Sequence, residues 1–302
     1  MPEEFARVGD VELCYETFGD PTDPTLLLIM GLATQMVAWQ DDFCAEIAGH
    51  GFHVVRYDNR DIGRSTRIDA PPPTLGQLIR RSKKSAAYRL PDMAEDAAGL
   101  IDHLGVERAH IVGASMGGMI AQVLAARHPE KVISLTSIMS NTGSQWAGQP
   151  AFSLYPALLK TAPRERAAYI EHIVGVYEKI GSTGVERNED DLRQIAALSF
   201  DRGTDGAGVA RQLAAIMASG DRTKELRKIK APTLVIHGAA DRLVRPSGGL
   251  ATQKAIPGAR LVLIEGMGHD LPRALWPRLI DLIVDNAQGA GAARGAQAAP
   301  AA

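Results

Sequence analysis

One serine lies between two glycines where an apolar run typical of a strand meets a run typical of a helix. Ser115 has Gly113 and Gly117 two residues to either side, in a Gly-x-Ser-x-Gly pattern. Glycines permit the sharp strand-to-helix turn that lifts a serine hydroxyl above a sheet. The first N–H groups of the helix then face the reacting carbonyl, which suits a developing oxyanion. The pattern predicts a nucleophile, although alone it also fits a glycine-rich loop with an incidental serine.

Two further residues with suitable chemistry follow predicted strands. Asp241 comes after the apolar run at 232–237, and His269 comes after the run at 261–264, in a glycine-containing turn. In a parallel sheet, active sites lie at the carboxyl ends of the strands, so we expect the three side chains to meet there. His269 would accept the proton of Ser115 and return it to the leaving group, while Asp241 would orient the imidazole.

Other residues fit these roles less well. His237 lies inside a predicted strand and is expected to be a packed, hydrogen-bonded residue. The strand before it ends in Ser140-Asn141, which offers no carboxylate. Asp270 is adjacent to His269 in sequence and is therefore poorly placed to bond its ring. The non-catalytic alternatives are that Asp241 only forms a turn and that His269 is an ordinary surface histidine.

Two backbone N–H groups are expected to hold the oxyanion. Met116 follows the serine directly, and Leu32 follows the predicted strand at 25–30, so their amides are the candidate donors. Because these roles use main chain, the side chains of both residues are free to shape the pocket. Together with Met30 and Trp39 they predict a pocket for an apolar or aromatic group.

Composition narrows the classes of protein. The 302 residues carry a formal net charge of −2, which gives no reason to expect a nucleic acid as partner. Cys14 and Cys44 are the only cysteines, and no H-E-x-x-H, C-x-x-C, G-x-G-x-x-G or P-loop pattern occurs. We therefore expect neither a metal nor another cofactor. The chain start lacks an apolar signal core, and the apolar runs are too short to span a membrane, so a cytoplasmic protein without a membrane partner is expected.

Strand-type and helix-type runs alternate along the chain, with one interruption. This alternation predicts an α/β fold, with a mostly parallel central sheet flanked by helices on both faces. Residues 141–225 contain no run that fits a buried strand and several that fit amphipathic helices, so we predict a helical cap inserted into a core of residues 1–140 and 226–286. Residues 287–302 are mostly Ala, Gly and Gln, and are predicted to be a disordered tail.

From about residue 11 to residue 286, the sequence resembles the α/β-hydrolase superfamily. The stretch D-N-R-D-I-G-R-S at 58–65 is similar to its D-x-R-G-x-G-x-S signature, with Asp61 in place of the first glycine. The turns at 238–241 and 266–269 resemble its acid and histidine turns. Met30-Gly31, where many members have His-Gly, and the G-x-S-M-G pattern resemble the aclacinomycin methylesterase-like hydrolases.

The resemblance implies a serine carboxylesterase that acts through an acyl-enzyme on small to medium apolar or aromatic esters, including methyl esters. Its partner would be a small-molecule ester, and the cap would set substrate preference. A serine nucleophile argues against haloalkane dehalogenases and epoxide hydrolases, which use an aspartate there. C–C bond hydrolysis, acyl transfer or cofactor-free perhydrolysis by the same residues stays open, as does a non-catalytic ligand receptor.

Overall fold

The computed structural model describes residues 2–80, 86–155 and 160–298. Within them, eight strands form one sheet in the order β1-β2-β4-β3-β5-β6-β7-β8. β1 and β2 pair antiparallel, as do β2 and β4, and every other neighbouring pair is parallel. The strands are β1 (Glu4–Val8), β2 (Val11–Phe18), β3 (Thr25–Ile29), β4 (His53–Tyr57), β5 (Ala109–Ala114), β6 (Val132–Ile138), β7 (Thr233–Gly238) and β8 (Arg260–Ile264).

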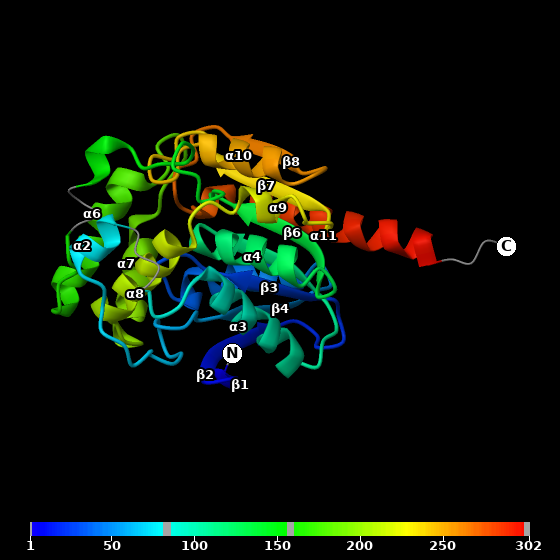
Figure 1. The fold of residues 1–302 in the computed structure, drawn as a ribbon, viewed down its shortest axis with the longest axis horizontal. Helices are drawn as coiled ribbons and strands as arrows, with labels where there is room; N and C mark the ends of the chain where they lie inside the picture. The colour runs from blue at the N-terminus through cyan, green and yellow to red at the C-terminus, as the bar shows by residue number, and fades with distance from the viewer. Residues whose placement is uncertain (1, 81–85, 156–159, 299–302) are drawn as a thin grey trace.

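Helices cover both faces of the sheet (Figure 1). α3 and α4 pack on one face, and α1 and α11 pack on the other. The helices are α1 (Asp41–Ala48), α2 (Leu75–Ile79), α3 (Leu90–His103), α4 (Met116–Arg127), α6 (Arg166–Ile180), α7 (Glu189–Asp201), α8 (Gly206–Ser219), α9 (Thr223–Leu226), α10 (Ser247–Ala255) and α11 (Trp276–Ala298). Short 3₁₀ helices occupy Met36–Ala38, Phe152–Leu154 and Arg273–Leu275. The mostly parallel sheet expected from the sequence is confirmed.

β3 shows why the central strands are continuously apolar. Leu27 and Ile29 lie in the hydrophobic cluster under α3 and α4, whereas Leu26 and Leu28 lie in the cluster under α1 and α11. Successive strand residues point to opposite faces, so a strand covered on both sides needs apolar residues at every position. β1 was not predicted, because within it only Ala6 is buried.

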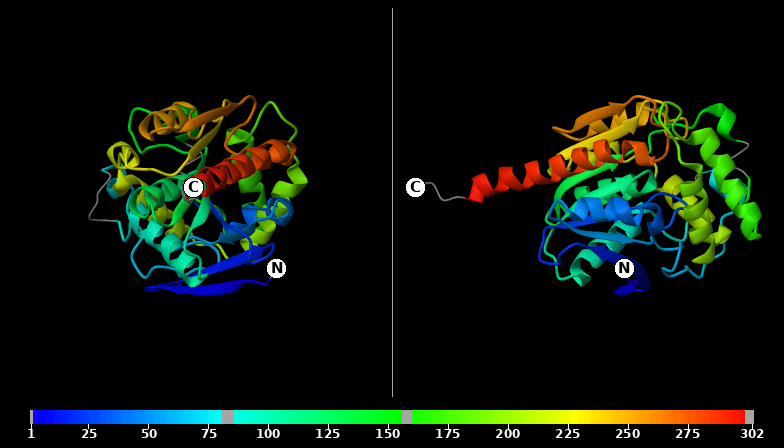
Figure 2. Two further views of the ribbon diagram at one scale, coloured as in Figure 1. Left: turned by 90° about the vertical axis from the view of Figure 1, so that its right-hand side faces the viewer. Right: turned by 180° about the vertical axis from the view of Figure 1, so that it is seen from behind.

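In its described residues, the segment between β6 and β7 consists of helices and loops and contains no strand. α6, α7 and α8 gather at one end of the molecule, away from the C-terminal end of α11 (Figures 1 and 2). Residues 156–159 of the predicted cap lie outside the described residues. The structure contains the helices that the sequence predicts for residues 141–225, while the division into two domains stays a prediction. We refer to residues 141–225 as the cap.

Local features of the sequence set two helix ends. α3 starts at Leu90, and the Asp92 carboxylate accepts the N–H of Arg89 at 2.7 Å. Asp92 therefore caps the helix from inside its first turn. α11 continues to Ala298, although disorder is predicted from residue 287, and residues 299–302 lie outside the described part. Alanine favours helix, and Ala287 and Ala290 are buried.

Among the described residues, no helix combines the length and the apolar character that crossing a membrane would require.

Candidate active site

Ser115 occupies the single residue between β5 and α4. Its backbone has φ 56° and ψ −118°, a strained conformation, and its N–H donates to the carbonyl of Ile138 at 2.9 Å. A Cβ at Gly113 would collide with the carbonyl of Gly117, and a Cβ at Gly117 would collide with the carbonyl of Ile29. The two glycines of the pattern are therefore required by the close approach of backbone around the serine.

The structure brings Ser115, His269 and Asp241 into one hydrogen-bonded chain. The Nε2 atom of His269 lies 2.9 Å from Oγ of Ser115, and its Nδ1 atom lies 2.7 Å from Oδ2 of Asp241. Asp241 is 2 % exposed and His269 is 8 % exposed. With Nδ1–H donated to the carboxylate, Nε2 is free to accept the serine proton, the arrangement that nucleophilic catalysis requires.

The turn that carries Asp241 is braced by its own backbone and by His237. Oδ1 of Asp241 accepts the N–H groups of Leu243 and Val244, both at 2.9 Å. Nε2 of His237 lies 2.7 Å from the carbonyl oxygen of Val244, and burial lowers the pKa of this histidine. His237 is thus a packed, hydrogen-bonded residue of β7, as the sequence indicates.

The cap holds the turn that carries His269. The N–H of His269 donates to the carbonyl of Ile180, at the end of α6, at 2.7 Å. The N–H of Gly268 donates to Oγ of Ser182 at 2.9 Å, and the N–H and hydroxyl of Ser182 donate to Oδ1 of Asp270. Asp270 therefore binds the cap and not the imidazole. Nothing in the local sequence pattern around Ser182 indicates this contact.

The predicted oxyanion donors lie on the loop after β3 and at the start of α4. A Cβ at Gly31 would lie 3.0 Å from Cβ of Ser115, so the loop that leads into Leu32 runs directly beside the serine. Met116 is the first residue of α4, where N–H groups have no intrahelical acceptor. Within the described part of the chain, neither amide has a hydrogen-bond acceptor. Both N–H groups are thus available to a ligand.

The predicted pocket residues pack into the core. Trp39 is fully buried and stacks on Phe43 with ring centroids 5.5 Å apart, and Met30 is buried in the same cluster. The side-chain amide of Asn59 donates to the carbonyl of Met30 at 2.9 Å, which fixes the end of β3. This packing accounts for both side chains without a ligand, and their contact with substrate stays a prediction.

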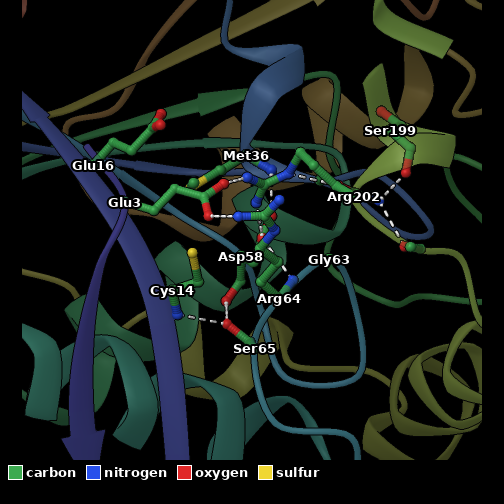
Figure 3. A network of polar contacts seen from close by, with 12 residues as sticks. Glu3, Cys14, Glu16, Met36, Asp58, Gly63, Arg64, Ser65, Ser199 and Arg202 are labelled. Atoms are coloured by element: carbon green, nitrogen blue, oxygen red, sulfur yellow. Dashed lines mark hydrogen bonds and ion pairs between the residues drawn. The ribbon is translucent and has the colours of Figure 1, made fainter. Parts of the chain in front are cut away.

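The loop after β4 takes part in a buried network of polar contacts (Figure 3). The carboxylate of Asp58 accepts the N–H of Met36 at 2.8 Å and the N–H of Arg64 at 3.0 Å. It also forms an ion pair with Arg202, which follows α7 in the cap and pairs with Glu3 as well. Burial raises the pKa of Asp58 to about 6, against the effect of these hydrogen bonds. The network ties the start of the chain, the loop and the cap together.

Asp61 anchors a second cap helix to the same loop. Its φ is 70°, and aspartate is among the residues that tolerate this region, where the related signature has glycine. The guanidinium of Arg211, in α8, donates to both carboxylate oxygens at 2.9 and 2.7 Å. Tyr88 donates its hydroxyl and Ile68 its N–H to the same group, at 2.7 and 2.8 Å. The sequence signal for this anchor is an acidic residue at a glycine position.

Comparison with known proteins identifies the family. A family model described as the alpha/beta hydrolase fold matches residues 24–272, so the chain belongs to this family. Rhodomycin D methylesterase DauP of Streptomyces sp. (strain C5) is 30% identical over 96% of this chain and 99% of its own length. A pimeloyl-[acyl-carrier protein] methyl ester esterase of Aeromonas hydrophila is 25% identical over 84% and 91%.

Solved structures agree with this assignment. The enol-lactonase from Burkholderia xenovorans LB400 has a TM-score of 0.73 and 26% identity, covering 94% of this chain and all of its own. The resemblance to methylesterase-like hydrolases and the predicted α/β-hydrolase fold are therefore confirmed. The chain is a hydrolase of this fold, and its similarity to esterases and lactonases favours hydrolysis of ester bonds.

Proposed function

We propose that the protein is a serine carboxylesterase in which Ser115, His269 and Asp241 form the catalytic triad. The observation that carries this proposal is the pair of contacts at 2.9 and 2.7 Å that links a serine, an imidazole and a buried carboxylate at the ends of three strands. A serine hydroxyl is a poor nucleophile at neutral pH, and it becomes effective when an oriented base accepts its proton.

The reaction proceeds in two halves. His269 takes the hydroxyl proton as Oγ of Ser115 attacks the ester carbonyl, and the N–H groups of Leu32 and Met116 stabilise the tetrahedral oxyanion. The imidazolium, stabilised by Asp241, returns the proton to the departing alcohol and leaves an acyl-enzyme. His269 then deprotonates a water molecule that attacks the acyl group, and the carboxylic acid is released as the serine regains its proton.

The proposed substrates are small to medium apolar or aromatic esters, methyl esters among them. Two relatives are named for methyl ester cleavage, and a solved relative is named an enol-lactonase. Met30 and Leu32, the proposed pocket residues on either side of Gly31, have apolar side chains. These observations support an apolar acyl or alcohol group, and the cap helices over the strand ends are proposed to limit its size.

The test is turnover that depends on one serine. We expect the protein to hydrolyse p-nitrophenyl esters and a fluorophosphonate to label Ser115 in one-to-one stoichiometry. Ser115→Ala should lower kcat by about 10⁴-fold or more, because the nucleophile is lost, with the circular dichroism spectrum and Tm retained. Full esterase activity in Ser115→Ala would refute the assignment of the nucleophile.

Product analysis separates the rival activities. Hydrolysis gives equal amounts of acid and alcohol, and a panel from acetate to bulky polyketide methyl esters maps the preferred size. A new ester formed from an added alcohol would indicate acyl transfer, and a peracid formed from hydrogen peroxide would indicate perhydrolysis. Cleavage of a C–C substrate in preference to every ester would overturn the esterase proposal, as would ligand binding without any turnover.

A further inference from the structure

One buried side chain of the cap bridges two loops of the active-site rim. Gln212, in α8, is 0 % exposed. Its Oε1 accepts the N–H of Ala33 at 3.1 Å, and its Nε2 donates to the carbonyl of Arg60 at 2.9 Å. Ala33 belongs to the loop after β3 and Arg60 to the loop after β4, so the amide of Gln212 joins both loops to the cap.

The loop that Gln212 holds is conformationally demanding. Ala33 has φ 61°, a region that residues with a Cβ rarely adopt. The N–H of Thr34 lies 3.4 Å from the carbonyl oxygen of Gly31, so the hydrogen bond that closes this turn is long. The shorter bond to Gln212 therefore fixes the peptide between Leu32 and Ala33, one residue after the proposed oxyanion donor. A strained backbone of this kind persists only where its surroundings hold it.

The loop after β4 and helix α8, which Gln212 joins, are each held in place by other contacts. The side chain of Arg60 forms a two-point ion pair with Asp96 of α3, with both contacts at 2.6 Å. On the cap side, the neighbouring Arg211 is fastened to Asp61 by two hydrogen bonds. Gln212 therefore joins a loop and a helix that are each anchored by other contacts, and a movement of either element relative to the other would break one of its two hydrogen bonds.

We propose that Gln212 is a positioning residue for the oxyanion hole. It reaches from the cap to hold the loop after β3 so that the N–H of Leu32 faces the reacting carbonyl at Ser115. This inference rests on the esterase function proposed above and adds a role to it: the cap takes part in stabilising the transition state as well as in shaping the pocket.

The test compares the affinity for a tetrahedral adduct with the affinity for a ground-state ligand. A trifluoromethyl alkyl ketone forms a hemiketal with the serine and places an oxyanion in the hole, whereas the matching methyl ketone occupies the pocket without a stable adduct. Gln212→Met removes both hydrogen bonds at nearly constant volume. Gln212→Glu keeps the acceptor for Ala33, and Gln194→Met is the matched control at an exposed position of α7.

We expect Gln212→Met to lower kcat on p-nitrophenyl butyrate by about 10- to 100-fold, since loss of a whole oxyanion donor costs about 10²- to 10³-fold. The Ki of the trifluoromethyl ketone should rise by the same factor, and the Ki of the methyl ketone should change less than about twofold, because displacement of the N–H affects only the charged adduct. Gln212→Glu should lose less than Gln212→Met, and Gln194→Met should match the wild type.

Unchanged kcat in folded Gln212→Met overturns the inference, as does an equal loss of affinity for both ketones, which would indicate general damage to the pocket. If Gln212→Met does not fold, Gln212→Leu, which also lacks both hydrogen bonds, replaces it, and the ratio of its two Ki values decides in the same way. Failure of the proposed function has a different signature, since the wild type would then show neither ester turnover nor phosphonate labelling of Ser115, and both proposals would fall.

Discussion

At the scale of single residues, the space around Ser115 is set by glycines. Gly113 and Gly117 allow the strand-to-helix turn, and Gly31 lets the loop after β3 pass beside the serine. A Cβ at Gly31 would lie 3.0 Å from Cβ and 3.5 Å from Oγ of Ser115. Ser115 is the nucleophile of the proposed mechanism, so a methyl group at position 31 would press first against the nucleophile.

We predict that Gly31→Ala lowers kcat/KM by about 10-fold, because the added Cβ would displace the nucleophile by a few tenths of an ångström and a displacement of about 1 Å can cost about 100-fold. The matched control is Gly175→Ala, since a Cβ at Gly175, inside α6, would meet nothing within 4 Å. The control should keep its activity and gain about 0.5–1 kcal/mol of stability from the higher helix propensity of alanine. Steady-state kinetics and urea unfolding of both variants check this, and equal kinetics in the two would contradict it.

The sequence identifies the residues that follow strands and misses those that support them. Ser115, Asp241 and His269 are found because strand ends of a parallel sheet converge. Gln212 and Ser182 are not found, because each makes its contact across more than 80 positions of the chain and lies in a part of the cap without a motif. A buried glutamine on a helix has the same local pattern as an exposed one, so tertiary contact alone distinguishes them.

At the scale of elements, α8 is fastened to the core by a buried ion pair. Arg211 is 5 % exposed, and the hydrogen bonds that it donates to the carboxylate of Asp61 raise the pKa of its guanidinium. Asp61 is fully buried and also binds Tyr88 and Ile68. Removing one partner of such a pair leaves the other as an uncompensated buried charge. The resulting loss of stability exceeds the net stabilisation that the intact pair provides.

We predict that Asp61→Asn lowers the free energy of unfolding by about 3 kcal/mol, because the buried Arg211 loses its two-point carboxylate partner and keeps only the longer contact to Asp205 at 3.4 Å. Asparagine tolerates positive φ, so the loss is electrostatic rather than conformational. The double variant Asp61→Asn/Arg211→Met should recover part of the loss, since the unpaired charge is gone. A double-mutant cycle by urea unfolding measures this, and losses that simply add would exclude the coupling.

The elements that the sequence predicts best are those buried on both faces. β3 and β5 are continuously apolar, and α4 begins at a recognisable glycine pattern. β1 is missed because it is an edge strand with mostly exposed side chains. In the cap the helices are anticipated, but their docking is not, because the polar anchors Arg202 and Arg211 resemble exposed charges in sequence.

At the scale of the whole molecule, the cap contacts three loops at one rim of the sheet. Ile180 and Ser182 hold the turn of His269, Gln212 holds the loop after β3, and Arg202 pairs with Asp58 in the loop after β4. The loops that carry the candidate site are therefore held by contacts from the cap as well as from the core. Movements of the cap that break these contacts would alter the base and the oxyanion loop together.

Buried histidines give the fold a pH-dependent stability. His110, in β5, is 4 % exposed, with Nδ1 2.8 Å from Oγ of Ser134 and its ring edge-on to Phe52. Burial lowers its pKa to about 4 from an ordinary value near 6.5, and burial also lowers the pKa of His53 and of His237. In each case the neutral form is the one that the folded protein accommodates.

Acidification should therefore weaken the fold through these histidines. Above pH 6.5 the histidine is neutral in both states and its contribution is fully present; between pH 6.5 and 4 only the unfolded chain binds the proton, so the free energy of unfolding falls. From pH 7.5 to 5.0, His110 should account for a loss of about 2 kcal/mol. Urea unfolding at both pH values should show that His110→Gln lacks this part of the loss, while His50→Gln, at an exposed position, keeps it. An identical pH dependence in wild type and His110→Gln would show that folding does not lower the pKa of this histidine.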